Sequence, residues 1–534
     1  MADRRVSEPS DGGAEGGSQS VHDRALDEDP GPYEGLTPVL TRVPPPRGPS
    51  RRAMAVVLAV AGVVVVVAAA GLLQGSRPPT EAITESSIPA VTDPIFASPA
   101  APRISFAQLP SIPGSIAYVT SGAVAVVDST GTTHEIAEDA GVSFGFPAWS
   151  PDGTRIAVVG SDSSYSSISV FDVKQVRGGS SERQGPRVIY RSSTTPPFYL
   201  YWAPDGKTVS FLASEPEPTD LTLRLASIDG SPLDPGGNAP SIRRGNPLYF
   251  DWADPSHLLL HVGTGPRAFL GEVGRDGKST GARYADPGDF RSAAVSPDGR
   301  RVAYVQATTT GRSELVVGSR TGSRTRAVPA FGPTAFVFDP SGTTLATIGA
   351  DRPGGSDIGF PAGPLRLLDT ASGKARVLAD GFVLAFFWSP DGRTVALLRL
   401  EPRTGPTAAV DGPVGGGPPS DIARLVRYDM WAAVAATTEP SPSTAPATDV
   451  HLLFVDVATG TTRSDRIVQL PSPFVDQYLS YFDQYALSHR LWAPDGSALL
   501  MPLDEDGSTR VAAFSPNGGD PLFTIDGRMA FWSP

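Results

Sequence analysis

A turn motif, Trp-Ser-Pro-Asp-Gly, recurs along this chain of 534 residues. Copies, whole or degenerate, begin at Trp149, Trp202, Trp252, Val295, Phe338, Trp388 and Trp492, and a last Trp-Ser-Pro begins at Trp532. Most copies lie about 40 to 53 residues apart, with one gap of about 104 residues, and short apolar stretches flank them. Short strands repeated at this period are typical of four-stranded sheets arranged around an axis. The sequence therefore predicts an all-β protein with the architecture of a β-propeller.

The chemistry of the motif explains the turn. Pro151 fixes φ at the second position, Asp152 can bond to nearby backbone, and Gly153 suits the left-handed conformation that follows. Such a turn joins two antiparallel strands, and we expect the tryptophan before it to pack between neighbouring sheets. A shared place in the turn predicts a structural role, rather than a catalytic or metal-binding one, for Asp152, Asp205, Asp298, Asp391 and Asp495.

The strand pattern also predicts how the ring closes. After Trp149 we expect strands over 155–159, 167–173, 187–191 and 198–202. Ahead of it, 115–119, 123–128 and 134–137 form a unit that lacks its first strand, and the final segment 527–532 can supply that strand. Pairing of the two chain ends would remove an exposed sheet edge. The prediction is about eight four-stranded blades, circularly closed by the C-terminal strand; seven blades, or a further degenerate one within the long gap, are the alternatives.

These repeats resemble the TolB-like, WD40-like propeller repeats, whose signature is a Trp-Ser-Pro-Asp-Gly turn followed by an apolar strand. The resemblance covers roughly residues 114 to 534. It implies the propeller fold, but it implies no particular activity, because such propellers serve many unrelated functions.

An apolar segment near the N-terminus predicts a membrane anchor. Ala53 to Leu73 carries no charge, and its roughly 21 residues would reach about 31 Å as a helix, the thickness of the hydrocarbon core of a bilayer. A cleaved signal peptide is the alternative, although its apolar region is about 7 to 15 residues long. Arginines crowd the N-terminal flank, at Arg42, Arg47, Arg51 and Arg52. They predict a single-pass protein of the cell membrane with a cytoplasmic N-terminus and an extracytoplasmic propeller.

Composition assigns the remaining parts. Residues 1–52 are polar and rich in Gly and Pro, which predicts a disordered cytoplasmic tail, and residues 74–113 read as a Pro/Ser/Thr-rich stalk. The propeller occupies 114–534. The net charge of -12 argues against nucleic acid as a partner, and the absence of cysteine excludes disulfides and thiolate metal sites.

Two insertions are the candidate binding regions. Residues 401–448 and 471–488 interrupt the repeat in connections that leave the sheets opposite the Ser-Pro-Asp-Gly turns, so we expect them side by side on one loop-rich rim. The first contains a predicted amphipathic helix, and the second places its aromatic residues on one helical stripe. Aromatic side chains are enriched at binding surfaces. The candidate partner-binding residues are Trp431, Phe474, Tyr478, Tyr481, Phe482 and Tyr485; simple packing of the insertions on the rim is the alternative.

Residues suited to catalysis are sparse. The histidines are scattered apart from His257 and His261, which share one face of an expected strand. That pair would need a third ligand to hold zinc, so packing is the preferred explanation. We predict no catalytic, cofactor-binding or metal-binding residues. The function predicted is a membrane-anchored scaffold, tether or sensor whose loop-rich face binds an envelope protein or a cell-wall component; the alternative is an enzyme acting on polysaccharide or a small molecule at the central channel.

Overall fold

A computed structural model describes residues 109–174, 186–216, 220–229, 239–263, 268–284, 292–307, 312–321, 323–350, 360–403, 448–505 and 507–534. All of them belong to one compact unit, Glu85–Pro534. The predicted tail, the predicted spanning helix over 53–73, nearly all of the stalk and the insertion that carries Trp431 lie outside the described residues. Among the residues that are described, no helix has both the length and the apolar character needed to cross a bilayer.

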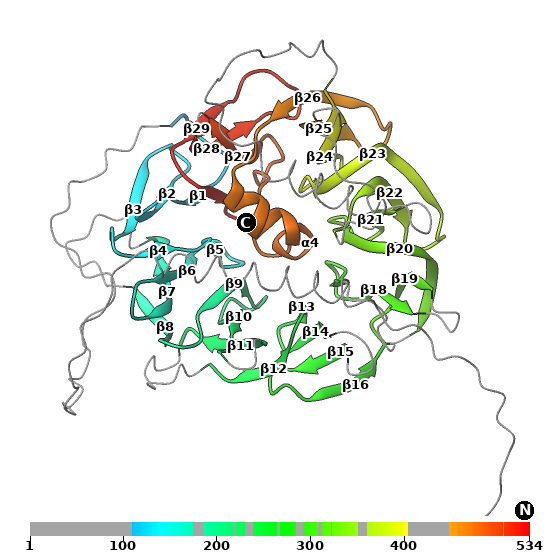
Figure 1. Ribbon diagram of the computed structural model, residues 1–534, viewed down its shortest axis with the longest axis horizontal. Helices are drawn as coiled ribbons and strands as arrows, with labels where there is room; N and C mark the ends of the chain where they lie inside the picture. Colours follow the sequence, from blue (N-terminus) through cyan, green and yellow to red (C-terminus); the bar gives the residue numbers. More distant parts are fainter. Residues whose placement is uncertain are drawn as a thin grey trace, which may run out of the picture. The chain divides into compact units, whose positions relative to one another are not determined.

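The described chain consists of antiparallel sheets that follow one another around a common centre in the order of the sequence (Figure 1). Antiparallel four-stranded sheets arranged in this way are the architecture of a β-propeller. The first four sheets contain β1 Ile116–Val119, β2 Ala123–Val127, β3 Thr133–Glu138 and β30 Met529–Trp532; β4 Ser143–Phe144, β5 Ala148–Trp149, β6 Arg155–Ser161, β7 Ser166–Asp172 and β8 Arg187–Ser192; β9 Pro197–Trp202, β10 Thr208–Ser214, β11 Leu221–Ser227 and β12 Ser241–Gly245; and β13 Leu248–Asp254, β14 His257–Val262, β15 Phe269–Gly274 and β16 Ser279–Arg283.

The remaining strands form a sheet of ten and a sheet of three. They are β17 Ala293–Val295, β18 Arg301–Ala307, β19 Ser313–Ser319, β20 Arg324–Phe338, β21 Thr344–Ala350, β22 Gly363–Asp369, β23 Ala375–Trp388, β24 Thr394–Pro402, β25 Thr448–Asp456 and β26 Thr462–Val468, followed by β27 Leu499–Glu505, β28 Ser508–Phe514 and β29 Phe523–Ile525. Two of them, β20 and β23, are unusually long because each begins as the outer strand of one four-stranded unit and continues as the inner strand of the next. The sheet of ten therefore contains three successive units.

The first sheet contains strands from both ends of the chain. Its order is β3-β2-β1-β30, and the antiparallel register pairs Ile116 with Trp532 and Val119 with Met529. The sequence predicted this pairing of the last strand with the first unit, and the pairing is present. All four residues of β1 and all four of β30 are buried.

The repeated turn has the geometry that its residues require. Gly153 has φ of 66°, and the Asp152 carboxylate accepts hydrogen bonds from Ser150 Oγ (2.6 Å) and from the Thr154 backbone N–H (3.1 Å). Equivalent bonds within the turn are made by Asp205, Asp298, Asp391 and Asp495. The structural role predicted for these aspartates is confirmed.

The tryptophan of the motif contacts the preceding sheet by hydrogen bonding as well as by packing. Trp202 Nε1 donates to the carbonyl oxygen of Ala148 (2.9 Å), and Trp492 Nε1 donates to that of Phe387 (3.0 Å). Each acceptor directly precedes the aromatic residue of the previous motif. An indole supplies both the apolar surface and the hydrogen-bond donor for this contact between neighbouring sheets, which we call the seam. This explains why tryptophan recurs there.

Candidate functional site

The second insertion turns inward instead of lying on the rim. After β26 the chain forms three short helical turns, η2 Phe474–Tyr478, η3 Leu479–Tyr481 and α4 Phe482–Tyr485. Helix α4 contacts β13 of one sheet and both β20 and β23 of the sheet of ten, and Figure 1 shows it beside the centre of the ring. We name residues 471–489 the central segment. The expected position on the rim is therefore corrected, and three short helical turns replace the single helix that was expected.

Three of the six predicted binding residues are buried in the central segment. Phe474 and Tyr478 have 0% of their surface exposed, and Phe482 has 1%. Phe482 makes an edge contact with Phe386 (ring centroids 5.3 Å apart), and Tyr478 stacks on Phe531 of the last strand (6.0 Å). In this conformation these three rings cannot contact a partner, because the surrounding sheets provide the apolar surface that they cover.

The other three candidate binding residues are not fully buried or lie outside the described residues. Tyr481 and Tyr485 are partly buried: Tyr481 lies near Tyr249 (6.3 Å between centroids), and Tyr485 contacts Tyr199 (4.9 Å). Trp431 lies outside the described residues. A binding role for Trp431, Tyr481 and Tyr485 stays a prediction.

Polar contacts hold the central segment to distant sheets. The Tyr199 hydroxyl donates to the Gln484 carbonyl oxygen (2.7 Å), and the Ser292 hydroxyl donates to the Asp483 carboxylate. Tyr199 is the bulged residue where β9 pairs with β10, and its φ of 47° is the only positive value among the described residues other than glycine. A residue other than glycine or asparagine is strained at positive φ, so surrounding contacts must hold Tyr199 in this backbone conformation. The contact with Gln484 is one of them.

Two buried carboxyl groups lie in this region. Asp251 accepts hydrogen bonds from the Val295 backbone N–H (2.8 Å) and the Tyr201 hydroxyl (3.1 Å), and burial raises its pKa to about 7. Burial likewise raises the pKa of Asp483 to about 6. Perturbed carboxyls are common at active sites, but they also occur in structural networks. Both groups are bonded to protein and 8% or less exposed, which favours the structural role here.

Neither carboxyl group is among the site residues predicted from the sequence. A signal existed for Asp251, which stands alone within the otherwise apolar run Leu248–Ala253. A carboxylate between buried strand residues must find hydrogen-bond donors inside the protein.

The described cavity beside the central segment is small. It measures about 80 Å³ and is lined by residues that include Phe146, Tyr199, Gln477, Tyr485 and His489. Sites for organic ligands usually measure about 300 to 1,000 Å³. Burial lowers the pKa of His489 to about 3, so this imidazole is neutral at physiological pH. A larger open groove of about 520 Å³ lies at the opposite end of the sheets, between the turns at Ser389 and Ser497.

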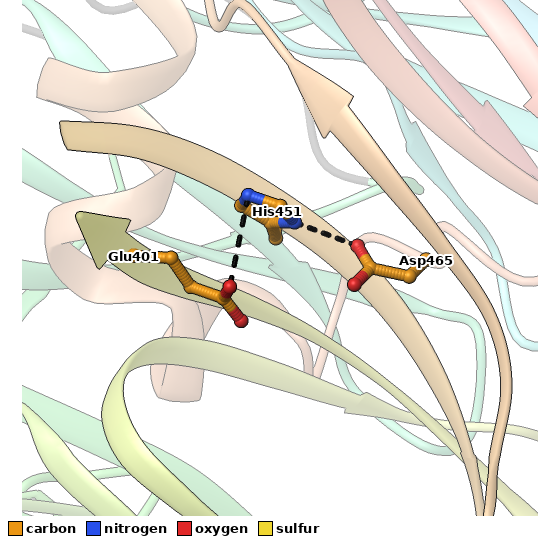
Figure 2. A group of neighbouring side chains, drawn as sticks. All are labelled: Glu401, His451 and Asp465. Atoms are coloured by element: carbon orange, nitrogen blue, oxygen red, sulfur yellow. Dashed lines mark hydrogen bonds and ion pairs between the residues drawn. The ribbon is translucent and has the colours of Figure 1, made fainter. Parts of the chain in front are cut away.

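One group of metal-ligand type occurs among the described residues. Glu401 on β24, His451 on β25 and Asp465 on β26 come from three adjacent strands, and Figure 2 shows the imidazole between the two carboxylates. His451 Nδ1 lies 2.7 Å from Asp465 Oδ1, and its Nε2 lies 3.9 Å from Glu401 Oε2. The expectation of no metal-binding residues did not consider this combination, because the long insertion separates Glu401 from the other two in sequence.

The histidine pair considered in the sequence does not form such a group. His257 Nδ1 lies 2.9 Å from the Asp254 carboxylate, whereas His261 is fully buried.

No protein-family model matches the sequence, and neither does any curated protein sequence. Among solved structures, one titled a eukaryotic initiation factor is 10% identical, with 79% of this chain and 98% of that chain covered and a TM-score of 0.43. A dihydro-heme d1 dehydrogenase, NirN, is 14% identical over 82% of this chain and 78% of its own (TM-score 0.46). TolB from Acinetobacter baumannii is 19% identical over 49% of this chain and 62% of its own (TM-score 0.30). At these identities the likeness is one of fold alone.

Proposed function

We propose that the sheets form a closed propeller of eight blades and that the protein is a non-enzymatic, membrane-anchored binding protein. Its loop-rich face, defined as the end of the sheets opposite the Ser-Pro-Asp-Gly turns, engages an envelope protein or a cell-wall component. The protein acts there as a scaffold, tether or sensor. In the count of eight, β20 and β23 each serve two blades, and the strand ending at Trp492 joins β27–β29.

The packing of the central segment carries this proposal. The rings of Phe474, Tyr478 and Phe482 cover apolar surface from several sheets, so the segment occupies the region in which a propeller enzyme would place its substrate. Such an enzyme needs polar groups facing a cavity of suitable size. The described carboxyls Asp251 and Asp483 instead bond to protein groups. These observations favour recognition on an outer face over catalysis at the centre.

The loop-rich face is favoured because both insertions leave the sheets there. Residues 404–447 connect β24 to β25, and residues 471–489 follow β26. Binding residues are concentrated on loops held by a rigid scaffold. The membrane anchor and the orientation of the propeller are proposed from the apolar segment 53–73 and its flanking arginines.

Deletion of the first insertion tests the proposal. Full-length protein would be cross-linked in intact cells, and its partners compared by quantitative mass spectrometry for the natural chain, a 404–447 deletion, and a Trp431→Ala, Tyr481→Ala double variant. A deletion of 175–185 is the matched control, because the connection between β7 and β8 leaves the sheets at the opposite end. We expect the specific partner to be lost from the first two variants and retained by the control.

Equal capture by all four proteins would refute the assignment to the loop-rich face. Turnover of an envelope polysaccharide by the purified protein would support the enzyme instead. The membrane orientation is tested separately, since protease added outside intact cells should digest the propeller and spare the N-terminal tail.

A further inference from the structure

We propose that Glu401, His451 and Asp465 form a binding site for a divalent transition-metal ion, with His451 Nε2 and Glu401 Oε2 as ligands and Asp465 as the group that orients the imidazole. The three residues lie on one face of the sheet, because Arg399 pairs with His451 and Leu453 pairs with Asp465 across adjacent strands. The site does not depend on the proposed partner.

Hydrogen bonding selects the tautomer that a metal requires. Asp465 Oδ1 accepts a hydrogen bond from His451 Nδ1 at 2.7 Å. In the neutral imidazole the proton then resides on Nδ1, so Nε2 carries a lone pair. A carboxylate on the outer nitrogen is the usual second partner of a metal-binding histidine, because it fixes the ring and makes the ligand more basic. Asp465 holds this position.

The separation of the two ligand atoms is close to the one that a shared ion requires. His451 Nε2 and Glu401 Oε2 are 3.9 Å apart, which is too long for a hydrogen bond between them. Zinc bonds to nitrogen and to carboxylate oxygen measure about 2.0 to 2.2 Å, so at the tetrahedral angle two ligand atoms lie about 3.3 to 3.6 Å apart. A shift of a few tenths of an ångström in the Glu401 side chain would bring both atoms to this separation, with the remaining positions of the ion filled by water.

Neighbouring charges orient Glu401 and limit the affinity. Arg399 contacts Glu401 Oε1. The other oxygen of this carboxylate, Oε2, faces the His451 imidazole (Figure 2). Arg403 pairs with Asp449, which lies opposite Glu401 across the strands. With neutral His451, the three carboxylates exceed the two guanidinium groups by one negative charge, and a cation compensates that charge. The positive charge of the Arg399 guanidinium repels a metal cation, so we expect the affinity for the metal ion to be moderate.

The donor set selects the kind of metal. Imidazole nitrogen suits zinc, nickel and copper, whereas magnesium and calcium prefer sites made entirely of oxygen. We expect Zn²⁺ and Co²⁺ to bind and Mg²⁺ not to compete with them. All three side chains retain some exposure, with His451 at 17% and Asp465 at 44%, so an ion has access from solvent.

Calorimetric titration of the full-length, chelator-treated protein with ZnCl₂ tests the site. We expect one site per chain, a loss of affinity of at least 100-fold in His451→Ala, and a loss of about 10- to 100-fold in Glu401→Gln and Asp465→Asn. His134→Ala is the matched control, because His134 also bonds to a carboxylate, Asp128 at 2.8 Å, but belongs to no group of three ligand-type side chains among the described residues. Its affinity should equal that of the natural protein.

Absence of zinc binding up to about 1 mM, corresponding to about 4 kcal/mol, would overturn the proposal, as would equal affinities of His451→Ala and His134→Ala. If His451→Ala does not fold, Glu401→Gln decides, since it keeps the shape of the side chain; unchanged affinity in that variant also overturns the site. The absorption spectrum of the Co²⁺-loaded natural protein gives an independent readout, and a spectrum of hexaaqua cobalt alone would contradict an imidazole ligand.

Discussion

The indole Nε1 of Trp149 donates a hydrogen bond to the backbone carbonyl oxygen of Phe531, 3.0 Å away and 382 residues later in the chain. This is the same contact that Trp202 makes with Ala148, one residue before the preceding motif. The series of seam contacts therefore continues across the two ends of the described chain. The hydrogen bond and the buried apolar surface of the indole together account for the tryptophan in the motif.

We predict that Trp149→Phe destabilises the protein more than Trp532→Phe. Both substitutions remove buried volume, but only the first leaves the Phe531 carbonyl oxygen without its donor. Trp532 is fully buried, and its Nε1 has no hydrogen-bond partner among the described residues. An unpaired buried polar group costs about 1 to 3 kcal/mol, so the difference should be about 1 to 2 kcal/mol. Urea unfolding followed by circular dichroism measures it, and equal losses would contradict the importance of the seam bond.

Removing residues 527–534 should abolish cooperative unfolding of the propeller. The truncation deletes β30, exposes an edge of β1 and removes the acceptor of Trp149, and it deletes the fully buried rings of Phe531 and Trp532. Truncation of one such ring costs about 3 to 5 kcal/mol. Removal of Pro534 alone, which is partly exposed, is the control. Calorimetry should show a normal transition for the control and none for the longer truncation; two similar transitions would mean that the ring does not need its last strand.

The central segment should behave as part of the core. Tyr478→Ala and Phe482→Ala each remove a buried ring, and we expect losses of about 3 to 5 kcal/mol in the free energy of unfolding. Gln477→Ala, at an exposed position of the same segment, should change stability by less than about 0.5 kcal/mol. Chemical denaturation of the three variants decides the matter. Unfolding free energies close to that of the natural protein in all of them would restore these rings as candidates for partner binding.

Stability should fall as pH rises from about 4 to 7, in part because of Asp251. Burial raises the folded-state pKa of this carboxyl to about 7, whereas the unfolded value is about 4. Its stabilising contribution is therefore fully present below about pH 4 and is lost as pH rises through the folded value. Asp251→Asn should flatten this slope, and substitution of exposed Asp520 by Asn should not. Thermal unfolding across the pH range gives the comparison, and identical slopes in Asp251→Asn and the natural protein would show that Asp251 does not titrate in this window.

The sequence alone determined the strands, their turns and the pairing of the two chain ends. The expected strand 155–159 lies within β6, and 198–202 lies within β9. These features are local, because short runs of apolar residues bounded by turn residues and the φ preferences of proline and glycine depend on the residues themselves. The unit ahead of Trp149 lacks its first strand, and the chain has an extra strand ending at Trp532. These two facts predicted that the last strand pairs with the first unit.

The tertiary structure decided where the insertion goes and which polar groups meet. An aromatic stripe over 474–485 needs apolar surface to cover, but the sequence does not say whether a partner or the protein supplies it. That surface exists only after β13, β23 and β30 have assembled, and it buries Phe474, Tyr478 and Phe482. Glu401, His451 and Asp465 likewise become neighbours only through the register of three strands, since one of the connections between those strands is a long insertion. Local periodicity therefore predicted the repeat, and only non-local packing buried the central segment and brought Glu401, His451 and Asp465 together.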